Sequence, residues 1–183
     1  AYSPKDFDGI KENNQDEKDE LFKMIYAGKA WDWKGIHIFL KAVAKAYIDN
    51  HIENFQIKLI GIRFKEEQDS VMGWVDELGL GKNVELIPFI QRDELLKMET
   101  QCDLSIYPAF RDSGSMSILE ACAIGVSSVC FDAGGQDVFP DDILLKVPVS
   151  KTYDECLNAF AEKLDWAYQN RTKLKEIGLN AQK

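Results

Sequence analysis

The fold is decided by residues 22–62, which read FKMIYAGKAWDWKGIHIFLKAVAKAYIDNHIENFQIKLIGI. The segment begins with a short apolar run at 22–28 that ends on glycine, a pattern typical of a buried strand. Apolar residues then recur at helical spacing over 34–50, and a second apolar run follows at 56–62. A strand, a helix and another strand at this spacing predict a βαβ unit, whose two strands lie parallel in one sheet.

The rest of the chain repeats this alternation. Further strands are expected at 83–89, 103–109, 127–133 and, with a weaker pattern, 143–149. Helices are expected at 66–80, 93–100, 115–124, 152–169 and 171–180. Because crossovers between parallel strands are right-handed, this order predicts an α/β fold. We expect a doubly wound, Rossmann-like parallel sheet of about six strands, forming one domain over residues 21–183.

Charge and composition restrict the classes of partner. The chain carries 31 acidic and 22 basic residues among its 183, a formal net charge of −9, which argues against nucleic acid as a partner. Residues 1–20 are rich in acids and poor in apolar residues, and are predicted to be a flexible acidic lead-in or linker. The sequence begins at Ala1 rather than Met, so a fragment of a longer protein is one interpretation. Four scattered cysteines without C-x-x-C pairing favour reduced core thiols over a zinc site.

The loop after the first strand is a candidate anion site, because ligands of such sheets bind beyond the carboxyl ends of the strands. It places Lys29 and Lys34 around a turn that opens a helix. A helix N-terminus attracts anions, and two ammonium groups beside it favour a diphosphate site. The alternative is that both lysines are solvated loop charges. The spacing does not match a P-loop.

The loop after the fourth strand is the most informative segment. Residues 110–117 combine small polar side chains with a glycine, so that backbone N–H groups can approach a ligand closely. Glu120 follows in a helix that is otherwise nearly all apolar, and a carboxylate buried there needs partners, such as two ribose hydroxyls. Ser117 and Glu120 also match the capping box S-x-x-E, in which Glu120 would only cap the helix. Both interpretations stay open. Gly134-Gly135 and Arg63 follow neighbouring strands on the same rim.

These motifs together resemble a known family. Gly28-Lys29-x4-Lys34-Gly35, then Asp112-x7-Glu120, then Gly134-Gly135 is an order similar to that of the C-terminal half of retaining GT-B glycosyltransferases of family 4. The resemblance covers about residues 22–180, and its most specific piece is the acidic-x7-Glu motif. The RDSG form of that motif, together with Trp33-Lys34-Gly35, resembles a branch that acts in polysaccharide or lipopolysaccharide assembly.

The resemblance implies a substrate and a role for each matching residue. The substrate would be a nucleotide-sugar donor (UDP-, GDP- or ADP-sugar), bound without a metal or other cofactor. The implied donor-binding residues are Lys29 and Lys34 for the diphosphate, Asp112 for the transferred sugar, Ser113, Gly114, Ser115 and Met116 for the distal phosphate, Glu120 for the ribose, and Phe89 and Ile90 for the base. Of these, Lys34, Asp112 and Glu120 would be catalytic.

The resemblance also implies that the chain is part of an enzyme. A whole enzyme of this type has two Rossmann-like domains with the active site between them, and the N-terminal, acceptor-binding domain is not in this sequence. We therefore expect the chain to bind a donor but not to transfer sugar by itself. Its partners would be the missing domain and a glycan or lipid-linked acceptor, in the cytoplasm or at the inner face of the membrane.

The sequence departs from the family pattern at several positions. Lys29 stands where the family usually has arginine, and Asp112 has a shorter reach than glutamate. Arg63 replaces the second glycine of a G-x-G, Pro88 replaces a glycine before the base-contacting residues, and Asp137 falls one position short of the usual acid. These departures keep open a second interpretation, a non-catalytic nucleotide-sugar-binding or scaffolding module. A flavodoxin-like signalling domain shares the alternating pattern but needs an acidic cluster where this chain has Gly28-Lys29.

Overall fold

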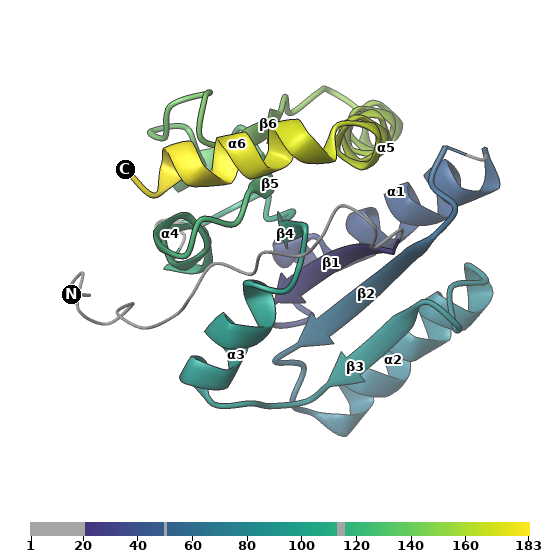
Figure 1. Ribbon diagram of the computed structural model, residues 1–183. Helices are drawn as coiled ribbons and strands as arrows, with labels where there is room; N and C mark the ends of the chain where they lie inside the picture. The colour runs from purple at the N-terminus through teal and green to yellow at the C-terminus, as the bar shows by residue number, and fades with distance from the viewer. Residues whose placement is uncertain (1–20, 50, 113–115) are drawn as a thin grey trace.

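A computed structural model describes residues 21–49, 51–112 and 116–183, and shows a parallel sheet with helices on both faces (Figure 1). The strands are β1 (Phe22–Ala27), β2 (Phe55–Ile60), β3 (Val84–Ile87), β4 (Leu104–Tyr107), β5 (Ser128–Phe131) and β6 (Leu145–Val147). The helices are α1 (Ile36–Ile48), α2 (Lys65–Glu77), α3 (Arg92–Glu99), α4 (Met116–Ala123), α5 (Tyr153–Gln169) and α6 (Arg171–Ala181). Two short 3-10 turns, η2 (Asp32–Lys34) and η3 (Gly134–Gln136), follow β1 and β5.

The strand order is β3-β2-β1-β4-β5-β6, and all neighbours pair in parallel. The chain thus runs outward from β1 to β3 on one side and from β4 to β6 on the other. The point where the order reverses lies between β1 and β4, and this is where sheets of this kind bind ligands. The predicted doubly wound, Rossmann-like fold is confirmed. The acidic stretch 1–20 lies outside the described residues, so its role as a linker stays a prediction.

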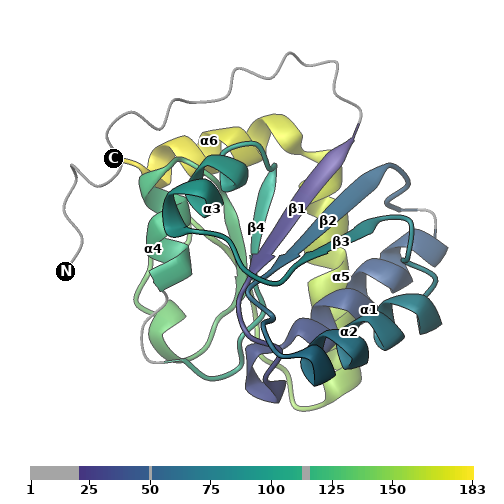
Figure 2. The same cartoon turned by 90° about the horizontal axis from the view of Figure 1, so that it is seen from below.

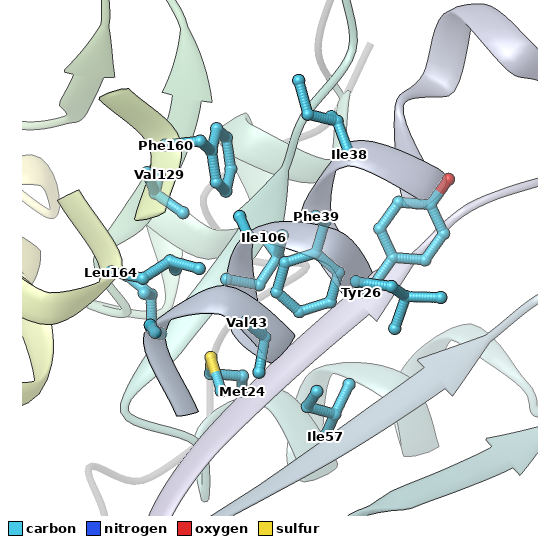
Figure 3. Close-up of a cluster of buried hydrophobic side chains, with 14 of the residues drawn as sticks. Met24, Tyr26, Ile38, Phe39, Val43, Ile57, Ile106, Val129, Phe160 and Leu164 are labelled. Carbon is cyan, nitrogen blue, oxygen red and sulfur yellow. The ribbon is translucent and has the colours of Figure 1, made fainter. Parts of the chain in front are cut away.

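The two faces of the sheet carry different helices (Figure 2). On one face α1 packs against α2 and α5, and on the other α4 packs against α3 and α6. The main core lies between the sheet and α1 and α5. Figure 3 shows apolar side chains that meet there: Met24 and Tyr26 of β1, Phe39 and Val43 of α1, Ile106 of β4, Val129 of β5, and Phe160 and Leu164 of α5. Each large side chain buried in this way contributes about 1.5–3 kcal/mol to folding.

The elements differ from the predicted ones mainly at their ends. Gly28 and Gly61 make the last hydrogen bonds of their ladders, to Ile60 O at 2.9 Å and Ile87 O at 3.2 Å, after which the chain leaves the sheet. The strands β1 and β2 therefore end before these glycines. The helix predicted from 34 begins only at Ile36, because η2 takes up the preceding turn. Neither 3-10 turn was predicted.

Candidate functional site

The loops after β1 and β4 are fixed against each other at the carboxyl edge of the sheet. Gly35, with φ of +71°, ends η2 and is the N-cap of α1. A Cβ at this position would lie 1.9 Å from the carbonyl oxygen of Pro108, so only glycine fits. Beside it, the Phe110 N–H donates to the Trp33 carbonyl oxygen at 3.0 Å. The two loops therefore hold a defined relative position.

Lys34, Asp112 and Tyr107 form a hydrogen-bonded cluster at this junction. The Lys34 ammonium and the Tyr107 hydroxyl both donate to Asp112 Oδ2, and Lys34 Nζ also donates to the Tyr107 hydroxyl at 3.4 Å. Burial alone would lower the pKa of Lys34, but the interactions with Asp112 and Tyr107 outweigh it and raise this pKa. Lys34 therefore stays charged at neutral pH. Its side chain is 23% exposed and that of Asp112 15%, so a ligand can reach both.

A cavity of about 300 Å³ opens beside this cluster, and we call it the inner cavity. Its walls include Gly28, Lys29, Lys34, Asp112, Met116 and Ser117. The Tyr26 hydroxyl donates to the Lys29 carbonyl oxygen at 2.7 Å, which holds the loop, and Lys29 Nζ lies 4.0 Å from the centroid of the Trp31 ring. Two ammonium groups thus share a cavity with the first residues of α4. This arrangement suits an anion.

Glu120 is buried in α4 and paired with a residue of α3. The helix begins at Met116, so Ser117 is its second residue and cannot be the N-cap of a capping box. The capping interpretation is therefore wrong. Glu120 is 8% exposed, and its Oε1 accepts a hydrogen bond from Arg92 Nε at 2.7 Å. This ion pair supplies the partner that a buried carboxylate needs.

The residues implied for the base lie on the loop after β3. Phe89 is 51% exposed, and the guanidinium carbon of Arg63 lies 4.4 Å from the centroid of its ring. Gly61, with φ of +94°, turns the loop after β2 toward the one after β1, where a Cβ would lie 3.2 Å from the Gly28 carbonyl oxygen. Arg63 thus forms an exposed stacked pair with Phe89.

The predicted site residues divide into three groups. The inner cavity brings together Lys29, Lys34, Asp112 and Met116, whereas Phe89, Ile90 and Glu120 do not line it. Ser113, Gly114 and Ser115 lie outside the described residues. Sequence reasoning missed Tyr107, because it stands in a strand that is buried throughout. It also missed Arg92, which is 28 residues from Glu120, a separation that no local spacing rule connects.

Glu99 is a further carboxyl group that the sequence did not single out. It ends α3 and is 2% exposed. The pKa of Glu99 is raised to about 7, chiefly by burial. A hydrogen bond from Ser105 lowers this pKa, and the nearby Glu120 raises it further. Glu99 therefore titrates near neutral pH.

Within residues 21–49, 51–112 and 116–183, no group of three His, Cys, Asp or Glu side chains is placed to hold a metal ion. None of the helices in these ranges is long and apolar enough to span a membrane. Cys122, Cys130 and Cys156 are buried free thiols, and Cys102 is half-buried. Burial raises the pKa of Cys122 to about 11 and that of Cys130 to about 12, so these thiols are protonated at neutral pH.

Comparisons with known proteins concern the family and the fold of the chain. The family model of glycosyl transferases group 1 matches residues 8–183. No curated protein matches the chain. Sucrose-phosphate synthase from Thermosynechococcus elongatus is similar in structure, with a TM-score of 0.76 and 22% identity over 88% of this chain and 39% of that one. Anabaena Alr3699/HepE, solved in complex with UDP and glucose, gives a TM-score of 0.74 and 22% identity over 99% of this chain and 47% of that one.

A shorter similar structure is the C-terminal domain of a glycosyl transferase group 1 family protein, LpcC, from Francisella tularensis. Its TM-score is 0.73 at 18% identity, over 88% of this chain and 82% of that domain. At such identities the likeness establishes the fold, which matches a Rossmann-like domain of GT-B glycosyltransferases. The chain spans less than half the length of the sucrose-phosphate synthase and the HepE chains.

Proposed function

The chain belongs to the group 1 family of glycosyl transferases, and from that premise we propose that it is the donor-binding half of a retaining glycosyltransferase of family 4. In this proposal the whole enzyme moves a hexosyl group from a nucleotide-sugar to a hydroxyl acceptor in polysaccharide or lipopolysaccharide biosynthesis. The observation that carries the proposal is the inner cavity, where Lys29, Lys34 and Asp112 meet the first residues of α4.

We assign the donor diphosphate to the inner cavity. Lys29 has no ion-pair partner among the described residues, and Lys34 is charged. During transfer the bond between the sugar carbon and the diphosphate oxygen breaks, and the nucleoside diphosphate leaves with the electron pair. The acceptor oxygen forms the new bond to the sugar carbon, and its proton passes to the departing phosphate oxygen. Cations placed where this charge develops stabilise it by several kcal/mol. The two lysines and the N-terminus of α4 would supply that stabilisation, so the proposal requires no metal or other cofactor.

We propose that the carboxylates of Asp112 and Glu120 accept hydrogen bonds from hydroxyl groups of the donor. Asp112 is held by Lys34 and Tyr107 at the edge of the inner cavity, where it would accept hydrogen bonds from the transferred sugar. Glu120 uses Oε1 for Arg92, and its Oε2 takes no hydrogen bond from the described part of the chain. We propose that Oε2 accepts from the ribose. Phe89, which stacks on Arg63, and Ile90 would contact the nucleotide base.

The length of the chain supports its assignment to one half of an enzyme. It covers 39% of the sucrose-phosphate synthase chain and 47% of the HepE chain. Residues 21–183 would be the donor domain, and residues 1–20 would lead in from an N-terminal domain that binds a glycan or lipid-linked acceptor. The proposed location is the cytoplasm, free or at the inner face of the membrane.

Thermal unfolding with UDP, GDP and ADP tests the proposal. A ligand that binds only the folded state stabilises it by RT ln(1+[L]/Kd), about 2.7 kcal/mol at 100 times Kd. We expect a shift of the melting temperature with at least one nucleotide and its nucleotide-sugar. Glu120→Ala, compared with its own ligand-free melting temperature, should lose most of that shift. No shift with any of the three would contradict the proposal and favour a scaffolding module.

A further inference from the structure

A second, larger cavity adjoins the inner one, and we call it the outer cavity. Its volume is about 650 Å³, and it is lined by Trp31, Trp33, Lys34, Arg111 and Asp112. Trp31, Lys34 and Asp112 line the inner cavity as well. The ion pair of Lys34 and Asp112 therefore stands between the two cavities. Any group bound in the outer cavity lies next to the groups to which the transfer reaction is assigned.

Two tryptophans give the outer cavity an aromatic wall. Trp31 is 38% exposed and Trp33 48%, and their ring centroids lie 4.9 Å apart with the planes tilted by 44°. Both tryptophans are fixed by their surroundings. Trp33 lies in η2, and its carbonyl oxygen accepts a hydrogen bond from the Phe110 N–H; Lys29 Nζ lies over the ring of Trp31. The face of an indole carries negative charge density and attracts the positively polarised C–H groups of a sugar ring.

Arg111 gives the same cavity a cation. It is exposed, and no side chain of the described residues pairs with it or hydrogen-bonds to it. A guanidinium group binds a carboxylate or a phosphate through two parallel hydrogen bonds. Aromatic rings beside an arginine that has no ion-pair partner in the described part of the chain therefore fit a sugar that carries an acidic substituent.

We propose that the outer cavity is an acceptor subsite, in which a pyranose ring stacks on Trp33 and its acidic substituent binds Arg111. The proposal rests on the proposed function, because it takes the inner cavity as the place of the donor diphosphate. An acceptor hydroxyl must reach the sugar carbon that leaves the diphosphate, and the outer cavity opens beside that point across Asp112. The donor half would then supply part of the acceptor specificity.

The test uses the full 183-residue chain and two matched disaccharides. Cellobiouronic acid carries a carboxylate that cellobiose lacks, and both are titrated while tryptophan fluorescence and amide NMR shifts are followed, with and without saturating nucleotide. We expect saturable binding of the acid that nucleotide does not displace. Arg111→Gln should reduce its affinity about tenfold, to the level of cellobiose, because the charge-assisted hydrogen bonds to the carboxylate are lost.

Tryptophan variants separate the subsite from general effects. Trp33→Ala should abolish saccharide binding, Trp33→Phe should retain part of it, and Trp166→Ala, a change at an exposed tryptophan of α5, should leave it unchanged. Affinity for the nucleotide should stay the same in all three. The proposal is overturned if neither disaccharide binds while a nucleotide does, if Trp33→Ala binds as well as the wild type, or if nucleotide displaces the acid. Failure to bind any nucleotide overturns the proposed function instead.

Discussion

Lys34 and Glu120 each form an ion pair with a residue that is distant in the sequence. Lys34 contacts Asp112, which is 78 residues away, and Glu120 of α4 contacts Arg92 of α3, which is 28 residues away. The sequence indicated which residues carry charge near the carboxyl edge, but the partner of each depends on how the strands are ordered. The sequence could therefore name Lys34, Asp112 and Glu120 as candidate residues, but it could not predict which residue pairs with each of them.

Glu99 predicts a pH dependence of stability. Its pKa of about 7 in the folded chain lies above the ordinary value of 4.5, so the folded state holds a proton that the unfolded state releases. The stability from this protonation is complete below pH 4.5 and is lost as the pH rises toward 7. A shift of this size corresponds to about 3 kcal/mol.

Urea unfolding of Glu99→Gln between pH 4.5 and 8 measures this contribution. The amide cannot ionise, so we expect the variant to lose less stability with rising pH than the wild type. Glu94→Gln, at an exposed position of the same helix, is the control and should follow the wild type. Parallel curves for Glu99→Gln and the wild type would show that Glu99 does not titrate in this range.

At the scale of whole elements, apolar spacing predicted each of the six strands and six α-helices that the structure describes. The errors in the prediction lie at the ends of these elements and in the loops, where the two 3-10 turns were missed. Gly35 shows why. Its contact with Pro108, which follows β4 and is 108 − 35 = 73 residues away in the chain, is not visible in the spacing within residues 34–50, so that spacing could not reveal η2. The same limit applies at Ser117, where local spacing matched a capping box although α4 begins one residue earlier.

The packing of α6 depends on Gly178. A Cβ there would lie 2.1 Å from the Gly125 carbonyl oxygen and 3.0 Å from the Ser127 nitrogen, both of them backbone atoms. Gly178→Ala must therefore push α6 away from the end of α4. We expect a loss of about 1–3 kcal/mol in the free energy of unfolding, measured by chemical denaturation.

Gly73 provides a matched control for this substitution. It lies in α2, and a Cβ there meets nothing within 4 Å. Gly73→Ala should stabilise the chain by about 0.5–1 kcal/mol, because alanine favours the helix. Equal effects of the two substitutions would contradict the close packing at Gly178.

At the scale of the whole molecule, the net charge of −9 hides a cationic rim. Lys29, Lys34, Arg63 and Arg111 follow β1, β2 and β4 at the carboxyl edge of the sheet. An acidic chain with cations at this edge suits a small anionic ligand and argues against a polyanion. The composition alone could predict that a polyanion is not the partner. The gathering of the cations at one edge follows only from the topology of the sheet.

The chain alone should bind donor without transferring sugar. In the proposed function this chain supplies only part of the acceptor site, and a second domain is needed to hold the acceptor hydroxyl at the sugar carbon. A radiolabelled-donor assay with a mixture of glycan and lipid-linked acceptors checks this expectation, with donor binding measured on the same sample. Transfer above the level of a Lys34→Gln variant would show that the chain is complete as an enzyme.

Calorimetric titration of the wild type and Lys34→Gln with UDP, GDP and ADP tests the central claim, that the inner cavity binds a nucleoside diphosphate. Lys34→Gln removes a charged group that is proposed to donate to the diphosphate. Lys41→Gln, at an exposed position of α1 outside that cavity, is its control. We predict one site for at least one nucleotide, with affinity reduced about 10- to 100-fold by Lys34→Gln and unchanged by Lys41→Gln. Equal binding by wild type and Lys34→Gln, or no binding of any nucleotide to the wild type, would contradict the claim.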